Sequence, residues 1–160
     1  MNIIRSFPLR AVALALLFCT VAIAVASAPA GWFDMANCEM CAPMMAEKGL
    51  MENTKWESFS IATGMMNVMS VPSSYEAAFA RAHEKCNALG EKLQKGETLK
   101  LCGSCTAMGQ LLGQGAKMDQ VNAGSSHVVL LTATEPSLVA KIQAYEKKNV
   151  EEMAKMKKTS

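Results

Sequence analysis

The chain has 160 residues, of which 51% are hydrophobic and 19% are charged, a composition typical of one globular domain rather than of a disordered segment. Its 16 basic and 14 acidic residues give a formal net charge of +2. Arg5 and Arg10 lie in a segment that we expect to be removed, and the remaining chain, with 14 basic (16 minus 2) and 14 acidic residues, lacks the cationic excess that would predict a nucleic-acid partner.

Residues 1–30 are typical of a cleaved secretory signal peptide. Two arginines precede an apolar run over residues 11–26, and small residues follow as far as Ala30. We expect cleavage after Ala26 or Ala30, which would make the mature protein periplasmic or secreted. An uncleaved anchor is the weaker alternative, because the 16 residues of the run rise about 24 Å as a helix, less than a hydrocarbon core of roughly 30 Å.

Residues 31–160 are predicted to form a single domain built of two tandem units, about 35–97 and 98–160. A shift of 64 residues, without a gap, places six residues of the first unit on identical residues of the second. The pairs are Cys38 and Cys102, Cys41 and Cys105, Met44 and Met108, Gly49 and Gly113, Pro72 and Pro136, and Ser73 and Ser137. An ancient duplication explains these matches, and the alternative is a pair of C-x-x-C motifs with coincidental matches elsewhere.

The first unit is predicted to contain a short helix, a β-hairpin and a long helix. The short helix covers residues 43–51, and the hairpin strands cover 55–61 and 65–71 around a glycine turn. The long helix has an apolar stripe at helical spacing, formed by Tyr75, Phe79, Ala82, Cys86, Leu89 and Leu93. Ser73 and Glu76 have the spacing of a capping box at its start.

The second unit is predicted to repeat this order. A strand-like segment over residues 98–101 leads to a helix over 106–114, a hairpin with strands 118–122 and 127–134, and a helix over 136–155. Because one hairpin alone is marginally stable in water, we expect the two hairpins to join. The predicted fold is therefore α+β, with two pseudo-symmetric C-x-x-C/helix/β-hairpin/helix units forming one four-stranded antiparallel sheet and the long helices on one face.

The two C-x-x-C motifs are the candidate functional residues of the chain. Together they resemble the ligand set of a rubredoxin-like or zinc-ribbon site, in which two tight turns supply four thiolates to one tetrahedral ion. The first motif lies in a sulfur-rich stretch, with six sulfur atoms in eleven residues: Met35, Cys38, Met40, Cys41, Met44 and Met45. Soft thiolate and thioether ligands favour copper or zinc, so we predict a metal site made by Cys38, Cys41, Cys102 and Cys105, assisted by Met40, Met44 and Met45. Core filling is the alternative for these methionines.

The same cysteines admit two other hypotheses. The segment from Cys102 to Cys105 resembles the C-x-x-C of thioredoxin-like oxidoreductases, in which a helix N-terminus stabilises a thiolate, so an extracytoplasmic thiol-disulfide protein is one alternative. The βαβ unit of a thioredoxin fold is not predicted here. The other alternative is a non-catalytic secreted domain stapled by disulfides within or across the two motifs.

The remaining candidates carry less weight. Cys86 lies on the apolar stripe and is expected to be a buried, inert thiol, His83 could add an imidazole nearby, and His127 is at most a minor ligand. The sequence has no nucleophile elbow, zinc-protease motif, P-loop or haem-attachment motif. This pattern favours a metal binder or carrier, served by a membrane or periplasmic partner protein, over an enzyme.

Overall fold

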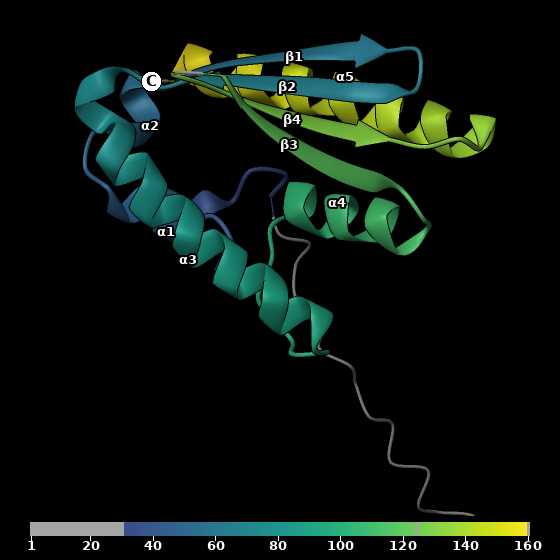
Figure 1. The fold of residues 1–160 in the computed structure, drawn as a ribbon, viewed down its shortest axis with the longest axis horizontal. Coiled ribbons are helices and arrows are strands. Elements are labelled where there is room, and N and C mark those ends of the chain that lie inside the picture. The colour runs from purple at the N-terminus through teal and green to yellow at the C-terminus, as the bar shows by residue number, and fades with distance from the viewer. Residues whose placement is uncertain (1–30, 124, 160) are drawn as a thin grey trace, which may run out of the picture.

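Two β-hairpins form the four-stranded antiparallel sheet of the computed structural model, which describes residues 31–123 and 125–159 (Figure 1). The predicted signal peptide, residues 1–30, lies outside the described residues. The first hairpin joins β1 and β2 and the second joins β3 and β4; their bounds are Lys55–Ile61, Gly64–Ser70, Lys117–Ala123 and Ser126–Thr132. The strand order is β1-β2-β4-β3, so the two hairpins meet through their second strands. The predicted α+β class and the joined sheet are confirmed.

Five α-helices complete the described part of the chain. They are α1 (Ala42–Ala46), α2 (Leu50–Asn53), α3 (Glu76–Gln94), α4 (Gly103–Gly113) and α5 (Pro136–Thr159). Two 3-10 turns, Met35–Asn37 and Ser73–Tyr75, precede α1 and α3. Within the described residues, no helix has both the length and the apolar character needed to cross a membrane.

Both long helices contact the same face of the sheet. Met65 and Met69 of β2 alternate with the outward-facing residues, and they pair with Leu131 and His127 of β4. Met65 and Leu131 pack against α5, with Leu111, Ala116, Leu138, Ile142 and Tyr145 in the same buried cluster. This cluster is the main core of the domain.

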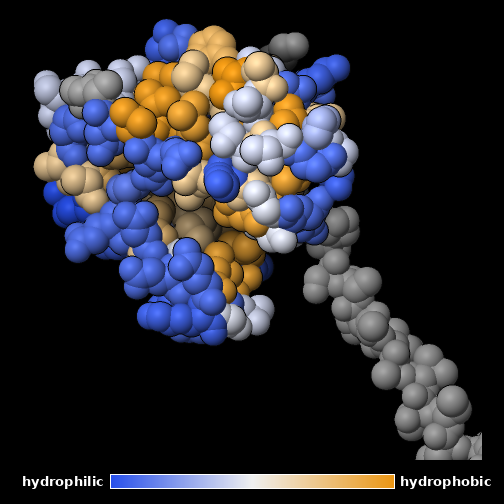
Figure 2. All heavy atoms as spheres, turned by 45° about the vertical axis from the view of Figure 1, so that its right-hand side comes forward, coloured by the Kyte–Doolittle hydropathy of each residue, from blue (hydrophilic) through white to orange (hydrophobic). Residues whose placement is uncertain are grey.

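The N-terminal half of α3 makes a second core. Phe79 and Ala82 are buried there with Leu50 and Val71, and Met44, Met69 and Tyr75 pack around them. The Phe79 ring also stacks on His127 of β4, with ring centroids 4.0 Å apart. Figure 1 shows that α5 follows the sheet along its length, whereas the C-terminal half of α3 points away from it. Hydrophilic residues gather at that end of α3, at the lower end of the view in Figure 2.

The predicted tandem repeat is not confirmed by the strand positions. The strands of the second hairpin follow those of the first by 62 residues (117 minus 55, and 126 minus 64), whereas the matching cysteines are 64 apart. The ungapped shift therefore does not extend through the hairpins. The helices also differ, because α1 and α2 are separate in the first unit whereas α4 is continuous in the second.

Three local predictions are wrong. The helix predicted over residues 43–51 is broken at Gly49, whose φ of 78° is left-handed and whose close approach to the Tyr75 ring leaves no room for a side chain. The capping box of Ser73 and Glu76 is absent, because Ser73 begins a 3-10 turn and Tyr75 is the N-cap residue of α3. The strand-like segment over residues 98–101 forms no strand, and the four strands of the sheet all come from the two hairpins, as predicted.

Candidate metal centre

The four cysteines of the two C-x-x-C motifs lie together. The sulfur atoms of Cys38, Cys41, Cys102 and Cys105 are all within 4.8 Å of one another, and the Sγ atoms of Cys41 and Cys105 are 3.8 Å apart. A tetrahedral ion with metal–sulfur bonds of about 2.3 Å places its ligand sulfurs about 3.8 Å from one another. The two motifs therefore come together as predicted, and their four sulfurs form a cluster that could hold one metal ion.

Each motif is shaped by the same backbone turn. The carbonyl oxygen of Cys38 accepts hydrogen bonds from the amides of Cys41 and Ala42, both at 3.0 Å, and the carbonyl of Cys102 accepts one from Thr106 at 2.9 Å. A turn of this kind brings the first and fourth side chains to the same side of the chain. Each motif thus presents its two sulfurs in one direction, as a bidentate metal ligand requires.

Backbone hydrogen bonds hold the first motif against the segment that precedes the second. The amide of Glu39 donates to the carbonyl of Lys100 at 2.9 Å, and the amide of Lys100 donates to the Glu39 carboxylate. Lys100 therefore pairs with Glu39 of the first C-x-x-C turn, and the strand-like segment 98–101 forms no strand. This pairing explains how two motifs separated by 60 intervening residues in the sequence meet in one centre.

The N-terminal segment of the described chain packs over the start of α4. The amides of Gly103 and Ser104, two of the donors left without a helical partner at a helix N-terminus, bond to the carbonyls of Gly31 and Trp32 at 3.2 and 2.9 Å. A Cβ atom at position 103 would lie 3.2 Å from the Trp32 Cα atom, so glycine permits this close approach. The second motif is fixed from this side by backbone contacts.

Helix α5 anchors the second motif from the other side. The hydroxyl group of Ser104, which is buried, bonds to the Tyr145 hydroxyl at 3.0 Å and to Oδ1 of Asn149 at 3.1 Å. The indole N–H of Trp32 donates to the same Asn149 oxygen at 2.8 Å. Sequence reasoning missed these four supporting residues. The small residues inside the second motif, Gly-Ser, were the only sign that other chain segments approach it closely.

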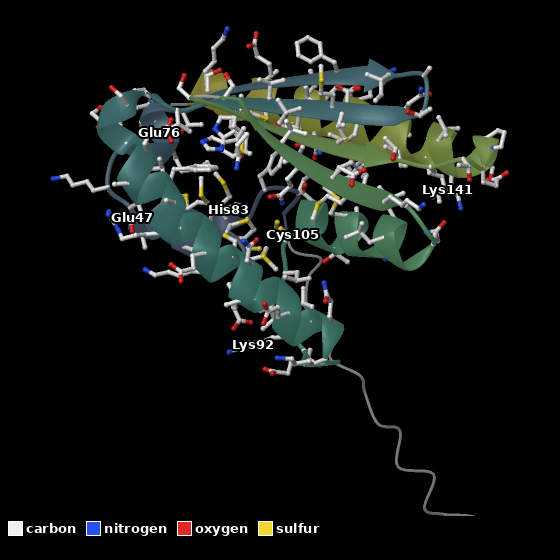
Figure 3. All side chains as sticks on the ribbon, viewed as in Figure 1. Glu47, Glu76, His83, Lys92, Cys105 and Lys141 are labelled. Atoms are coloured by element: carbon white, nitrogen blue, oxygen red, sulfur yellow. The ribbon has the colours of Figure 1, made fainter. Side chains whose placement is uncertain are left out.

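The four cysteines divide into a buried pair and a partly exposed pair. Cys38 and Cys102 are each only 1% exposed, whereas Cys41 and Cys105 reach the surface. Figure 3 shows Cys105 at the start of α4, with sulfur atoms gathered between it and α3. The buried pair forms the floor of the centre, and the exposed pair, Cys41 and Cys105, is the part open to solvent.

The two thiols of the exposed pair differ in pKa. The pKa of Cys41 is lowered to about 6, chiefly because the Cys105 thiol donates a hydrogen bond to its thiolate, although burial opposes this shift. The same contact, together with burial, raises the pKa of Cys105. The pKa of Cys102 is raised as well, mainly by burial. Of the exposed pair, Cys41 is therefore the thiol that loses its proton more readily, and Cys105 is the one that retains it.

The other predicted site residues lie around this centre in different settings. Cys86 is half-buried on α3, and its thiol points to the carbonyl of Met40 at 3.5 Å; burial, and then the charges of the nearby Cys41 and Cys38, raise its pKa. It is therefore less buried than predicted. Met40 is half-buried in the first motif, Met44 packs on the second core, and Met45 is 45% exposed.

The two histidines bond to residues outside the centre. His83 bonds through Nε2 to Gln120 of β3 at 3.0 Å, and His127 bonds through Nδ1 to Asn122 at 2.9 Å. Within the described residues, the four cysteines are the only group of three or more Cys, His, Asp or Glu side chains close enough to hold one ion. The imidazoles therefore do not extend this ligand set.

No protein-family model matches the chain, and searches of curated proteins and of solved structures found no match. The chemistry of the centre must therefore carry the functional conclusion. Four thiol groups from two turns can bind one soft metal ion, and two neighbouring thiols can exchange electrons as a dithiol and a disulfide. None of the five cysteines in the described part of the chain forms a disulfide.

Proposed function

We propose that the protein is an exported binder or carrier of one soft metal ion, copper or zinc, held by Cys38, Cys41, Cys102 and Cys105. The observation that supports this function is the convergence of four sulfur atoms within 4.8 Å from two motifs distant in the sequence. A tetrahedral set of this size fits Zn²⁺ or Cu(I), whereas oxygen-preferring ions such as Mg²⁺ and Ca²⁺ find no suitable ligands in it.

The unequal burial of the four thiols supports a carrier rather than a purely structural site. The buried pair holds the ion within the fold, and the exposed Cys41 and Cys105 leave one side of it accessible to the ligands of another molecule. Transfer by ligand exchange needs such access, because the incoming ligand must reach the metal before the outgoing one leaves. An export signal would place this exchange with a membrane or periplasmic partner protein.

Elemental analysis of the full-length protein tests the proposal. Protein prepared under reducing conditions and loaded separately with Zn²⁺ and with Cu(I) should retain one ion per chain after gel filtration. Cys102→Ala should lose that ion, because three thiolates cannot complete the tetrahedron, whereas Cys86→Ser should retain it. Metal retained by Cys102→Ala in equal amount, or absent from the wild-type protein, would contradict the proposed centre.

Substitution of the methionines near the first motif tests whether the centre is suited to copper or to zinc. Replacing Met40, Met44 and Met45 together with Leu conserves volume, so the fold should remain stable. Because a zinc site of four thiolates needs no thioether, Zn²⁺ affinity should then be nearly unchanged. We expect Cu(I) affinity to fall, most clearly under mildly oxidising conditions in which thiols are partly lost. Competition titrations of the wild-type and triple-variant proteins measure both; unchanged Cu(I) affinity would make these methionines core filling.

A second function is supported by two observations on the exposed pair, Cys41 and Cys105. The 3.8 Å separation of the Cys41 and Cys105 sulfurs, together with the lowered pKa of Cys41, is suited to an extracytoplasmic thiol-disulfide protein. The two functions use the same sulfurs in different states. Stoichiometric metal in the reduced protein favours the carrier, whereas an oxidised centre without metal favours the redox protein.

A further inference from the structure

We infer that the centre undergoes thiol-disulfide exchange with a low-molecular-weight disulfide, that the product is a bond between Cys41 and Cys105 across the two motifs, and that this bond releases the metal. The release step rests on the proposed function. The choice of sulfurs does not, because it follows from the geometry of the four cysteines.

Accessibility selects the sulfur that reacts first. A thiolate attacks a disulfide along the S–S axis, so the disulfide must be able to approach the attacking sulfur from outside. Cys38 and Cys102 are 1% exposed and cannot be reached in the folded protein, whereas Cys41 and Cys105 are partly exposed. A molecule of the size of glutathione disulfide therefore meets only the exposed pair of this centre.

Proximity selects the second sulfur. The Sγ atoms of Cys41 and Cys105 are in hydrogen-bond contact at 3.8 Å, and a disulfide bond is about 2.05 Å long. Closing the bond thus requires a movement of roughly 1.8 Å, shared between two side chains at the surface. Either bond within a motif would instead draw a buried sulfur, Cys38 or Cys102, away from the floor of the centre.

The exchange balances in two steps. The Cys41 thiolate attacks one sulfur of the external disulfide, which forms a mixed disulfide at Cys41 and releases one external thiolate. The Cys105 thiol then passes its proton to the external thiolate released in the first step, and its sulfur attacks the Cys41 sulfur, which forms the Cys41–Cys105 bond and releases the second external thiolate. The two cysteines lose two electrons and the external disulfide gains them.

Bond formation removes half of the metal ligands. Cys38 and Cys102 would remain, and two thiolates cannot complete a tetrahedral zinc site. We therefore expect the ion to leave on the open side of the centre as the bond forms. Reduction of the bond would restore all four thiols, so that release is reversible.

Disulfide mapping tests the choice of sulfurs on the metal-free, reduced full-length protein. After reaction with glutathione disulfide and alkylation of the remaining thiols, proteolysis after Glu39 separates Cys38 from Cys41, and fragmentation of the cross-linked peptide distinguishes Cys102 from Cys105. The expected product joins Cys41 to Cys105, with the other three thiols of the described chain alkylated. Cys86→Ser, the control variant, should give the same product. A main product that joins Cys38 to Cys41, joins Cys102 to Cys105, or includes Cys86 would overturn the inference.

The release step is measured on protein loaded with Zn²⁺, which does not itself oxidise thiols. A zinc-sensitive dye should report one ion released for each Cys41–Cys105 bond formed. Ion retained after the bond has formed would overturn the release step. Failure of the reduced protein to bind zinc or copper would contradict the proposed function instead, while the disulfide map would still decide which sulfurs react.

Discussion

Saturating the centre with zinc is expected to raise the free energy of unfolding by about 4 kcal/mol when free Zn²⁺ is at 1,000 times its dissociation constant. The stabilisation arises because the folded chain brings four thiols within 4.8 Å, whereas the unfolded chain offers two separate pairs. For a domain of this size, the midpoint of thermal unfolding should rise by roughly 10–20 °C. Calorimetry at fixed free-zinc concentrations measures this shift.

Two variants make the result specific to the centre. Cys102→Ala should abolish most of the shift, and alanine avoids the unpaired buried hydroxyl that serine would add at this 1% exposed position. Cys86→Ser should show the full shift. An equal shift in Cys102→Ala would mean that zinc binds elsewhere, and the four-cysteine centre would have to be abandoned.

Replacing Phe79 with alanine is expected to cost about 3–5 kcal/mol of folding stability. Phe79 is 4% exposed and joins α3 to the sheet by stacking on His127. The His127 Nε2 atom, which is buried and has no hydrogen-bond partner, lies 3.4 Å from the Glu76 carboxylate, so the ring contact helps to shield a weakly satisfied polar pair. Urea unfolding of the metal-free protein measures the loss.

Leu89 provides the matched control on the same helix. It shares the apolar stripe of Phe79 in the sequence, but it is only half-buried because α3 leaves the sheet before this position. Leu89→Ala should cost about 1 kcal/mol. Both variants, once folded, should keep the wild-type metal stoichiometry. Equal costs for the two substitutions would contradict the observed packing of α3.

The fold class was predictable because its signals are local. β-Branched and apolar residues on both sides of a glycine turn predict each hairpin, and the bounds of the first strand, 55–61, agree with β1. The need of one hairpin for a partner then predicts the joined sheet. The bend at Gly49 was less accessible, because proline and apolar residues favour a continuous helix there and only the contact with Tyr75 shows the break.

The candidate centre was predictable in composition but not in construction. Two C-x-x-C motifs predict four sulfurs, and the structure brings these four sulfurs into one cluster. The unequal burial within each motif could not be predicted, since burial depends on packing between segments that are distant in the sequence. The strand-like pattern of residues 98–101 was misleading. Its residue types favour an extended backbone, but that backbone bonds to Glu39 of the first motif rather than to a neighbouring strand.

The distance along the chain between the two motifs imposes an order of events on maturation. Cys41 and Cys105 are separated by 64 positions, so an unfolded chain offers no more than two neighbouring thiols of this centre at one place. Closing a loop of this length carries an entropy cost that the packing of the hairpins and α5 must offset before any ion gains a third thiolate. Tight metal loading would therefore come last, and a loaded chain would be one whose whole domain has already folded.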